Sequence, residues 1–194
     1  NHWDGADTGS LRGKTIGLLG VGSIGSEIAR TAKFFGMHVR GYTWSSEESK
    51  HVDEYFHPAQ QSNSSLFGFA SGLDYLVNIL PNTKDTRKII SAELLGALPA
   101  HALVINAGRG PAVDESAIIN ALKQNKIAGA VLDVFEQEPL PKEHPFWTTP
   151  NLLMTFHTAA PSLPEDITKL FIENYELFNE DRPLKYQVDF ERGY

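Results

Sequence analysis

The sequence predicts an α/β fold built on a doubly wound parallel sheet. Short, continuously apolar segments recur along the chain, and segments with helical spacing lie between them. Strands of a parallel sheet are buried on both faces, so they are continuously apolar rather than alternating. Their alternation with helices is typical of a parallel sheet that is covered on both sides. A glycine-rich turn between the first apolar segment and the first helix supports the same fold.

The elements follow from these patterns in order. The expected strands, each an apolar segment ended by turn or polar residues, are 15–20, 37–43, 75–80, 103–107, 129–134 and 152–155. The expected helices are 23–36, 91–97 and 114–124, with a poor, short one within 59–72. The apolar positions that share one face of the first helix are Ile24, Ile28, Ala29, Ala32 and Phe35. Ser162 and Glu165 have the spacing of a capping box with proline in the first turn, which predicts a last helix to about Asn179.

Composition excludes several functions. The 194 residues carry 17 basic and 24 acidic side chains, a net charge of −7, without the basic face expected of a nucleic-acid binder. The absence of cysteine excludes disulfides, thiolate metal sites and cysteine nucleophiles. No signal-peptide pattern and no apolar stretch of membrane-spanning length is present. We therefore expect a soluble, cytoplasmic protein with no nucleic-acid or membrane partner, and we assign no metal-binding residue.

The glycine-rich turn has the pattern G-x-G-x-x-G, from Gly20 through Gly22 to Gly25. It leaves a predicted strand and opens a predicted helix, which is the context that a dinucleotide-binding turn requires. Gly20 permits the tight turn, Gly22 the approach of a pyrophosphate, and Gly25 close packing of helix on sheet. The backbone at Ser23 and Ile24 opens the helix, whose amino-terminal end favours phosphate. The alternative is a glycine-rich turn without a ligand, which this context disfavours.

The position that contacts the adenosine ribose is occupied by Thr43. An NAD-selective site usually has Asp or Glu there, which would repel a 2′-phosphate. Nearby groups that could hydrogen-bond a phosphate are Ser45, Ser46 and Lys50. Glu47 and Glu48 would oppose one, and no arginine is present to clamp it. We therefore favour NADP over NAD, while an ordinary polar loop is an open alternative.

Four further segments carry a resemblance to the D-isomer-specific 2-hydroxyacid dehydrogenases. They are Leu-Pro-Asn-Thr-Lys-Asp-Thr at 80–86, Ile-Asn-Ala-Gly-Arg-Gly at 105–110, Leu-Asp-Val-Phe-Glu-Gln-Glu-Pro at 132–139, and Phe-His-Thr-Ala-Ala at 156–160. Their order and spacing resemble that family over nearly the whole chain. The closing segment, 187–194, looks like the end of the bacterial glyoxylate/hydroxypyruvate reductase subgroup.

The resemblance implies a catalytic set. Arg109 corresponds to the residue that binds the substrate carboxylate and keto oxygen, and a guanidinium suits this because it forks onto a carboxylate. His157 corresponds to the proton donor and Glu138 to its partner; a neighbouring carboxylate favours the protonated imidazole. The other six histidines are interpreted as surface or structural groups. Without the resemblance, Arg109 could cap a turn and Glu138 could be a solvated loop acid.

The resemblance also implies residues along the cofactor cleft. Asp133 matches the residue that faces the nicotinamide end, although a turn or helix cap is the alternative. The others, where backbone contacts matter more than side chains, are Leu80, Pro81, Thr86, Ala107 and Gly108. Gly108 stands where the family more often has alanine.

The resemblance implies an amino-terminal substrate domain that this sequence does not include, so we expect a piece of a longer protein rather than a natural truncation. We expect residues 1–160 to form the dinucleotide-binding domain, with a leading linker at 1–13, and 161–194 to pack toward that substrate domain. The implied function is NAD(P)H-dependent reduction of a small 2-keto acid to the D-2-hydroxy acid, by a homodimer. A phosphoglycerate dehydrogenase and a dinucleotide-sensing corepressor remain alternatives, because proteins of both kinds can share the Arg109, Glu138 and His157 set.

Overall fold

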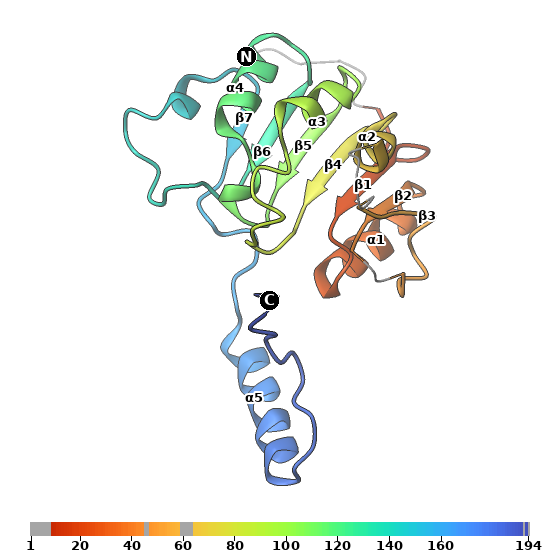
Figure 1. The fold of residues 1–194 in the computed structure, drawn as a ribbon, viewed down its shortest axis with the longest axis vertical. Coiled ribbons are helices and arrows are strands. Elements are labelled where there is room, and N and C mark those ends of the chain that lie inside the picture. The colour runs from red at the N-terminus through yellow and green to blue at the C-terminus, as the bar shows by residue number, and fades with distance from the viewer. Residues whose placement is uncertain (1–8, 45–46, 59–63, 192, 194) are drawn as a thin grey trace, which may run out of the picture.

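A single parallel sheet organises the chain in the computed structural model, which describes residues 9–44, 47–58, 64–191 and 193. Seven strands are hydrogen-bonded in the order β3-β2-β1-β4-β5-β6-β7, and every pair is parallel. Their bounds are β1 Thr15–Leu19, β2 His38–Tyr42, β3 Glu54–Phe56, β4 Tyr75–Asn78, β5 Leu103–Asn106, β6 Gly129–Leu132 and β7 Leu152–Met154. Figure 1 shows the strands running in one direction through the upper part of the molecule.

Helices connect these strands. Their bounds are α1 Ser23–Phe34, α2 Ser64–Ala70, α3 Ala92–Ala97, α4 Glu115–Lys123 and α5 Pro164–Asn179, with short 3₁₀ turns at Gly110–Ala112 and Pro145–Thr148. α1 packs against β1 and β2, whereas α2 contacts α3 and α3 contacts α4. The chain thus winds outward in both directions from β1 and β4, which gives the predicted doubly wound α/β fold.

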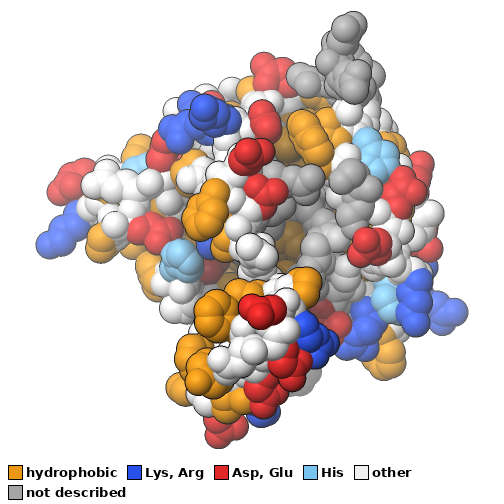
Figure 2. All heavy atoms as spheres, turned by 60° about the horizontal axis from the view of Figure 1, so that its bottom comes forward, with side chains coloured by type: hydrophobic (Ala, Val, Ile, Leu, Met, Phe, Trp, Pro, Cys, Tyr) orange, Lys and Arg blue, Asp and Glu red, His pale blue; other side chains and the backbone are white. Residues whose placement is uncertain are grey.

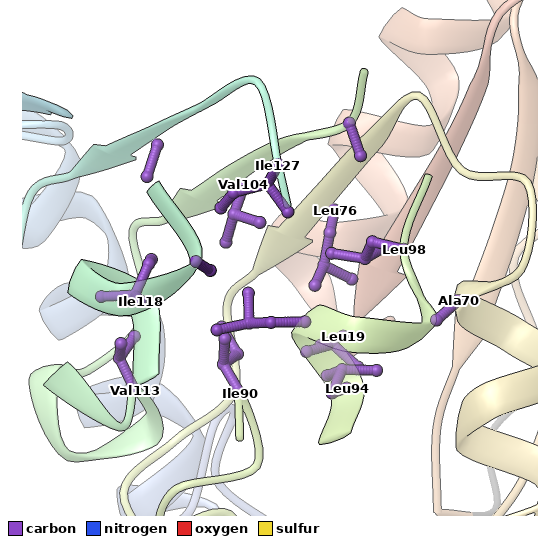
Figure 3. Packing of buried hydrophobic residues seen from close by; sticks show 14 of the residues in the cluster. Leu19, Ala70, Leu76, Ile90, Leu94, Leu98, Val104, Val113, Ile118 and Ile127 are labelled. Carbon is purple, nitrogen blue, oxygen red and sulfur yellow. The ribbon is translucent and has the colours of Figure 1, made fainter. Parts of the chain in front are cut away.

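Two apolar clusters hold the layers together. The larger joins the sheet to α2, α3 and α4; Figure 3 shows part of it, including Leu19, Leu76, Leu94 and Ile118, which are fully buried. The smaller lies under α1, where the buried residues are Ile16, Leu18, Val21, Ala29, Ala32, Met37, Val39 and Val77. Continuous apolar strands are therefore buried on both faces, as the sequence pattern predicted.

The structure corrects three predictions. β3 was not predicted, because Glu-Tyr-Phe is short, begins with a charge and lies at the sheet edge. Ile24 and Phe35 were assigned to the buried face of α1, yet they are 64% and 50% exposed. Of the predicted face, Ala29 and Ala32 are buried and Ile28 packs against the smaller cluster. The helix ends at Phe34, one residue before Phe35, so that side chain leaves the helical face.

The third correction concerns the start of α5. Its N-cap residue is Leu163, and no side chain caps the helix. Pro164 occupies the first turn as expected, but Ser162 lies one residue too early to form a capping box with Glu165. The predicted poor helix within 59–72 is α2, from Ser64 to Ala70; residues 59–63 lie outside the described part of the chain.

The last helix lies apart from the sheet. α5 extends away from it (Figure 1), and none of its residues is buried. Its exposed apolar side chains recur at helical spacing: Leu163, Ile167, Phe171, Ile172, Tyr175 and Phe178. Figure 2 shows hydrophobic side chains gathered on this projecting part. No helix within the described residues is both long and apolar enough to cross a membrane.

Packing at the β2–β3 end of the sheet rests on Phe69, which is fully buried and contacts Tyr42 and Phe56 at ring-centroid distances of 5.5 and 5.7 Å. We expect Phe69→Ala to lower the free energy of unfolding by about 3–5 kcal/mol, because it leaves a cavity that the rigid sheet cannot fill. Phe34→Ala is the matched control: this ring is 82% exposed, and its removal should cost less than about 0.5 kcal/mol. Equal urea midpoints for the two variants would contradict this packing.

Candidate active site

The glycine-rich turn joins β1 to α1 and leaves room for a diphosphate. Gly20 has φ of +97°, a conformation that side chains rarely adopt. A Cβ at Gly25 would collide with the carbonyl oxygen of Gly20, so helix and turn touch there. A Cβ at Gly22 would meet nothing within 4 Å, and no side chain caps the helix that begins there. No side chain therefore fills the space beside Gly22 or takes the free N–H groups of the first turn, which fits the phosphates of a dinucleotide.

Next to this turn, Ser23 and Ile24 begin α1 with exposed side chains, so their backbone N–H groups are the groups offered to a ligand. On the neighbouring strand, Thr43 follows β2 and donates its N–H to the carbonyl of Phe56 at 3.0 Å. No carboxylate occupies this position. Ser45 and Ser46 lie outside the described residues, so their predicted contact with a phosphate stays a prediction.

The loop after β4 is closed by its own side chains. The Thr86 hydroxyl donates to the carbonyl of Pro81 at 2.6 Å and accepts the N–H of Thr83 at 2.9 Å. Leu80 is half-buried and donates its N–H to the Asn78 side chain at 3.3 Å. Thr86 thus shapes the loop, and the contact of its backbone with the cofactor stays a prediction.

Two buried asparagines, which we did not single out from the sequence, tie this loop to the next. Asn78 ends β4 and donates through Nδ2 to Oδ1 of Asn106, which ends β5, at 2.8 Å. Asn106 also accepts the N–H of Gly108 at 3.1 Å and donates to the carbonyl of Arg109 at 3.1 Å. Both side chains are fully buried. The signal that could have revealed them is an asparagine closing each of two neighbouring apolar strands.

Arg109 lies between two glycines that admit no side chain. A Cβ at Gly108 would lie 2.9 Å from both Asn78 Nδ2 and the Leu80 carbonyl, and one at Gly110 would overlap the carbonyl of Phe135. The alanine that the resemblance implies at 108 therefore has no space in this chain. Arg109 is exposed, and its guanidinium donates one N–H to the Gly108 carbonyl at 2.7 Å. Its other donors remain for a ligand; Ala107, before it, is exposed as well.

Asp133, at the end of β6, holds the turn that follows β7. Its carboxylate, 5% exposed, accepts the backbone N–H groups of Thr158 at 3.0 Å and Ala159 at 3.2 Å, and the hydroxyl of Thr155. Burial raises the pKa of Asp133, but these hydrogen bonds and the nearby His157 outweigh it, so that the pKa lies below its ordinary value. An ionised Asp133 therefore anchors the turn.

The turn after β7 places His157 beside Glu138. Nδ1 of His157 lies 2.8 Å from Oε2 of Glu138, whose Oε1 accepts the N–H of Phe135 at 2.9 Å. The His157 hydrogen bond, followed by that of Phe135, lowers the pKa of Glu138. His157 has φ of +56°, a strained conformation for a residue with a side chain, and its N–H donates to the Asp133 carbonyl at 2.7 Å. With Nδ1 engaged, Nε2 is the nitrogen left to face a substrate.

A cavity of about 540 Å³ opens beside this pair. Its walls are largely apolar, formed by Phe135, Leu140, Trp147 and Phe156 together with the pair itself. The His157 side chain is 55% exposed. An imidazole bound to a carboxylate at the rim of a cavity can transfer a proton to a molecule placed there.

All predicted site residues within the described part of the chain follow the carboxyl ends of strands at one edge of the sheet. The glycine-rich turn follows β1, Thr43 follows β2, and Leu80 follows β4. Arg109 and Asp133 follow β5 and β6, and His157 follows β7. The structure joins Glu138 to His157 directly, whereas Arg109 makes no hydrogen bond or ion pair with either, and its strand β5 lies two strands from β7.

The parallel sheet and its glycine-rich turn define a Rossmann-type dinucleotide-binding domain. The profile of the D-isomer specific 2-hydroxyacid dehydrogenase NAD-binding domain matches residues 1–159, and the chain belongs to this family. A glyoxylate/hydroxypyruvate reductase A from Klebsiella pneumoniae is 36% identical over 93% of this chain and 56% of its own length. The chain thus spans about half the length of this curated relative.

Solved structures agree. A D-isomer specific 2-hydroxyacid dehydrogenase from Xanthobacter autotrophicus, in complex with NADPH and MES, has a TM-score of 0.89 at 37% identity and covers 99% of this chain and 77% of its own. An NADPH-dependent glyoxylate/hydroxypyruvate reductase from Sinorhizobium meliloti, in complex with NADP and sulfate, has a TM-score of 0.89 at 33% identity, with 99% and 60% covered. The fold and the NAD(P)-binding class are therefore those predicted.

The anchoring role of Asp133 gives a pH-dependent prediction. Because its folded-state pKa lies below the ordinary value, the carboxylate stabilises the fold above that ordinary value, and the contribution is lost as pH falls through the folded-state pKa. Asp133→Asn should lower the free energy of unfolding by about 1–2 kcal/mol at pH 7, and the gap should narrow in acid. Urea unfolding across pH measures both. Asp85→Asn, in an exposed loop, is the control; a gap independent of pH would contradict the assignment.

Proposed function

We propose that the protein reduces a small 2-keto acid, of the glyoxylate/hydroxypyruvate type, to the D-2-hydroxy acid. The hydrogen-bonded pair of Glu138 and His157, at the same sheet edge as Arg109 and the glycine-rich turn, is the observation that carries the proposal. The relatives named as glyoxylate/hydroxypyruvate reductases support this choice of substrate.

Each residue then has a defined task. Arg109 binds the carboxylate and the keto oxygen, because its free N–H groups can donate two charge-assisted hydrogen bonds. When bound, the reduced nicotinamide supplies a hydride to the keto carbon. His157 donates the proton from Nε2 to the developing alkoxide, while Glu138 holds the ring through Nδ1 and favours its protonated form. Asp133 positions the histidine through the turn that it anchors.

The alternatives from the sequence differ in what they require. A phosphoglycerate dehydrogenase would use the same three residues on a larger, phosphorylated acid, whereas a corepressor would bind the dinucleotide without needing turnover. The pair at the rim of an open cavity favours an enzyme, because the pair has a proton to give and room for a substrate. Turnover of glyoxylate, hydroxypyruvate or phosphohydroxypyruvate by the whole protein separates the three.

We further propose that α5 packs on the substrate domain of the whole protein. Its apolar side chains are exposed at helical spacing, and such a face is normally covered. A covering domain would also exclude water from the half-exposed His157 and strengthen its interactions. The homodimer and the cytoplasmic location stay predictions.

The assignment of the acid is testable in the protein. His157→Ala should lower kcat for reduction by about 10²–10⁴-fold with little change in dinucleotide affinity. Glu138→Gln keeps the hydrogen-bonding shape but removes the anion, so the protonated imidazole survives only to lower pH. The basic limb of the pH–rate profile for reduction should therefore move to lower pH.

Two variants serve as comparisons for this experiment. Arg109→Lys should weaken substrate binding and turnover together, because an ammonium cannot form the bidentate fork. His101→Ala removes a histidine paired with Asp74 at the opposite edge of the sheet, and it should leave kcat unchanged. If Glu138→Gln leaves the basic limb in place, Glu138 does not control the proton of His157.

The cofactor preference follows from Thr43. Without a carboxylate at this position we expect a higher kcat/KM with NADPH than with NADH, and the NADP-bound relatives support this. Thr43→Asp should shift the ratio toward NADH, because its carboxylate repels the 2′-phosphate. A clear preference of the unaltered protein for NADH would refute the expectation.

A further inference from the structure

A histidine that the sequence gave no reason to single out lies at the ribose end of the glycine-rich turn. His57 follows β3, the edge strand that was not predicted. Its Nδ1 lies 2.9 Å from the carbonyl oxygen of Thr43, and its Nε2 lies 2.6 Å from Oε1 of Glu47. The ring therefore bridges the end of β3 and the loop after β2, and its side chain is 38% exposed.

The position of His57 relative to the turn follows from the strand ends. Gly20 donates its N–H to the carbonyl of Tyr42 at 2.9 Å, and Thr43 donates to the carbonyl of Phe56 at 3.0 Å. These bonds align the ends of β1, β2 and β3, which are adjacent in the sheet. Neighbouring strands are about 4.8 Å apart, so His57 lies one strand beyond the residue that meets the adenosine ribose in this fold.

The hydrogen bonds of the ring define its chemistry. Because a carbonyl only accepts, Nδ1 donates to Thr43. Nε2 then binds an anionic oxygen, that of Glu47. This hydrogen bond, with that to Thr43, raises the pKa of His57. Both ring nitrogens face acceptors, so the ring makes both hydrogen bonds only as an imidazolium, and this imidazolium holds an oxyanion at Nε2.

The surroundings of the ring contain few other charges. From α2, the Ser65 hydroxyl donates only to the backbone oxygen of His57. Among the described residues, Glu47 is the one ionisable side chain that interacts with the ring. Positions 45–46 and 59–63 carry Ser, Ala, Gln and Asn only, and no arginine occurs from 41 to 63. Lys50 and His51 are the other basic side chains in this range; both lie in the described part of the chain, and neither makes a hydrogen bond or ion pair with Thr43 or Glu47. His57 is therefore the cation held at the end of β2 by hydrogen bonds.

We propose that His57 selects the cofactor: its Nε2–H binds the 2′-phosphate of NADP, and Glu47 is the exchangeable anion that occupies Nε2 in the absence of that phosphate. The Glu47 carboxylate is 58% exposed, so it is free to turn into solvent when the phosphate takes its place. The proposal rests on the proposed function as a dinucleotide-dependent enzyme. Thr43 only lacks a group that would repel the 2′-phosphate, whereas His57 attracts it.

The two members of the pair make opposite contributions. His57→Gln keeps a donor for the Thr43 carbonyl but removes the charge, so NADPH should bind about ten-fold or more weakly, the usual effect of losing a charge-assisted hydrogen bond. Glu47→Gln removes the competing anion, so NADPH should bind more tightly. NADH, which has no 2′-phosphate, should bind within about two-fold of the unaltered protein in both variants.

The affinity for NADPH should also depend on pH. Phosphate binding requires the protonated ring, so the preference for NADPH over NADH in affinity should fall as the pH rises through the titration of His57, whose pKa lies above its ordinary value. The His57→Gln variant should lack this dependence.

The experiment is a fluorescence titration of the protein with NADPH and with NADH, which measures Kd without turnover. His101→Gln is the matched control, because it removes another histidine–carboxylate pair at the opposite sheet edge; it should change neither Kd. Glu47→Gln, at an exposed position, keeps the test valid if His57→Gln fails to fold. Equal losses for both cofactors in His57→Gln, or unchanged NADPH affinity in either variant, would overturn the proposal while the proposed function stands. If the unaltered protein binds neither cofactor, both fail.

Discussion

Parallel pairing of all seven strands is the constraint on which the rest of the structure depends. Since every strand runs the same way, each carboxyl end lies at one edge of the sheet. The chain reverses its winding between β1 and β4, which separates the loops after these strands and creates the crevice where ligands bind in such sheets. The glycine-rich turn, Arg109 and His157 are distant in sequence, yet this single constraint assembles them along that edge.

Buried backbone N–H and carbonyl groups destabilise the fold when they lack hydrogen bonds at the ends of strands. Here, buried side chains supply those hydrogen bonds. Asn78 and Asn106 pair across β4 and β5, and Asp133 accepts two N–H groups of the turn after β7. Buried polar groups of this kind stabilise only when they are fully bonded. The same bonds fix the backbone of Arg109 and His157, so the groups proposed for chemistry are held by a rigid layer beneath them.

Exposure to solvent weakens the two histidine–carboxylate pairs of this sheet edge. Half of the His157 side chain faces solvent, where ion pairs are weak because water screens them. The pair of His57 and Glu47 is similarly exposed, which suits a group that exchanges one anion for another. Proton transfer benefits from a drier site, and the apolar side of α5 gives a covering domain a surface on which to pack. The proposals thus give one sheet edge two roles, an accessible end for the ribose and an end for proton transfer that a covering domain closes.

The sequence by itself determined the doubly wound fold, six of the seven strands and the glycine-rich turn, because apolar runs and glycine spacing record burial and turn geometry locally. The proposed catalytic set came from the resemblance of four motifs to a family and not from these local patterns. It could not reveal β3, whose pairing along β2 rather than its own apolar pattern makes it a strand. Nor could it show that Ile24 is exposed, since a helical face is buried only where a neighbour covers it. Tertiary structure decided the geometry that joins Glu138 to His157, which are 19 residues apart and which the sequence paired only through the family resemblance. It alone revealed the contact between His57 and Glu47. Such pairs depend on where strand ends meet in space, a relation that no local pattern encodes.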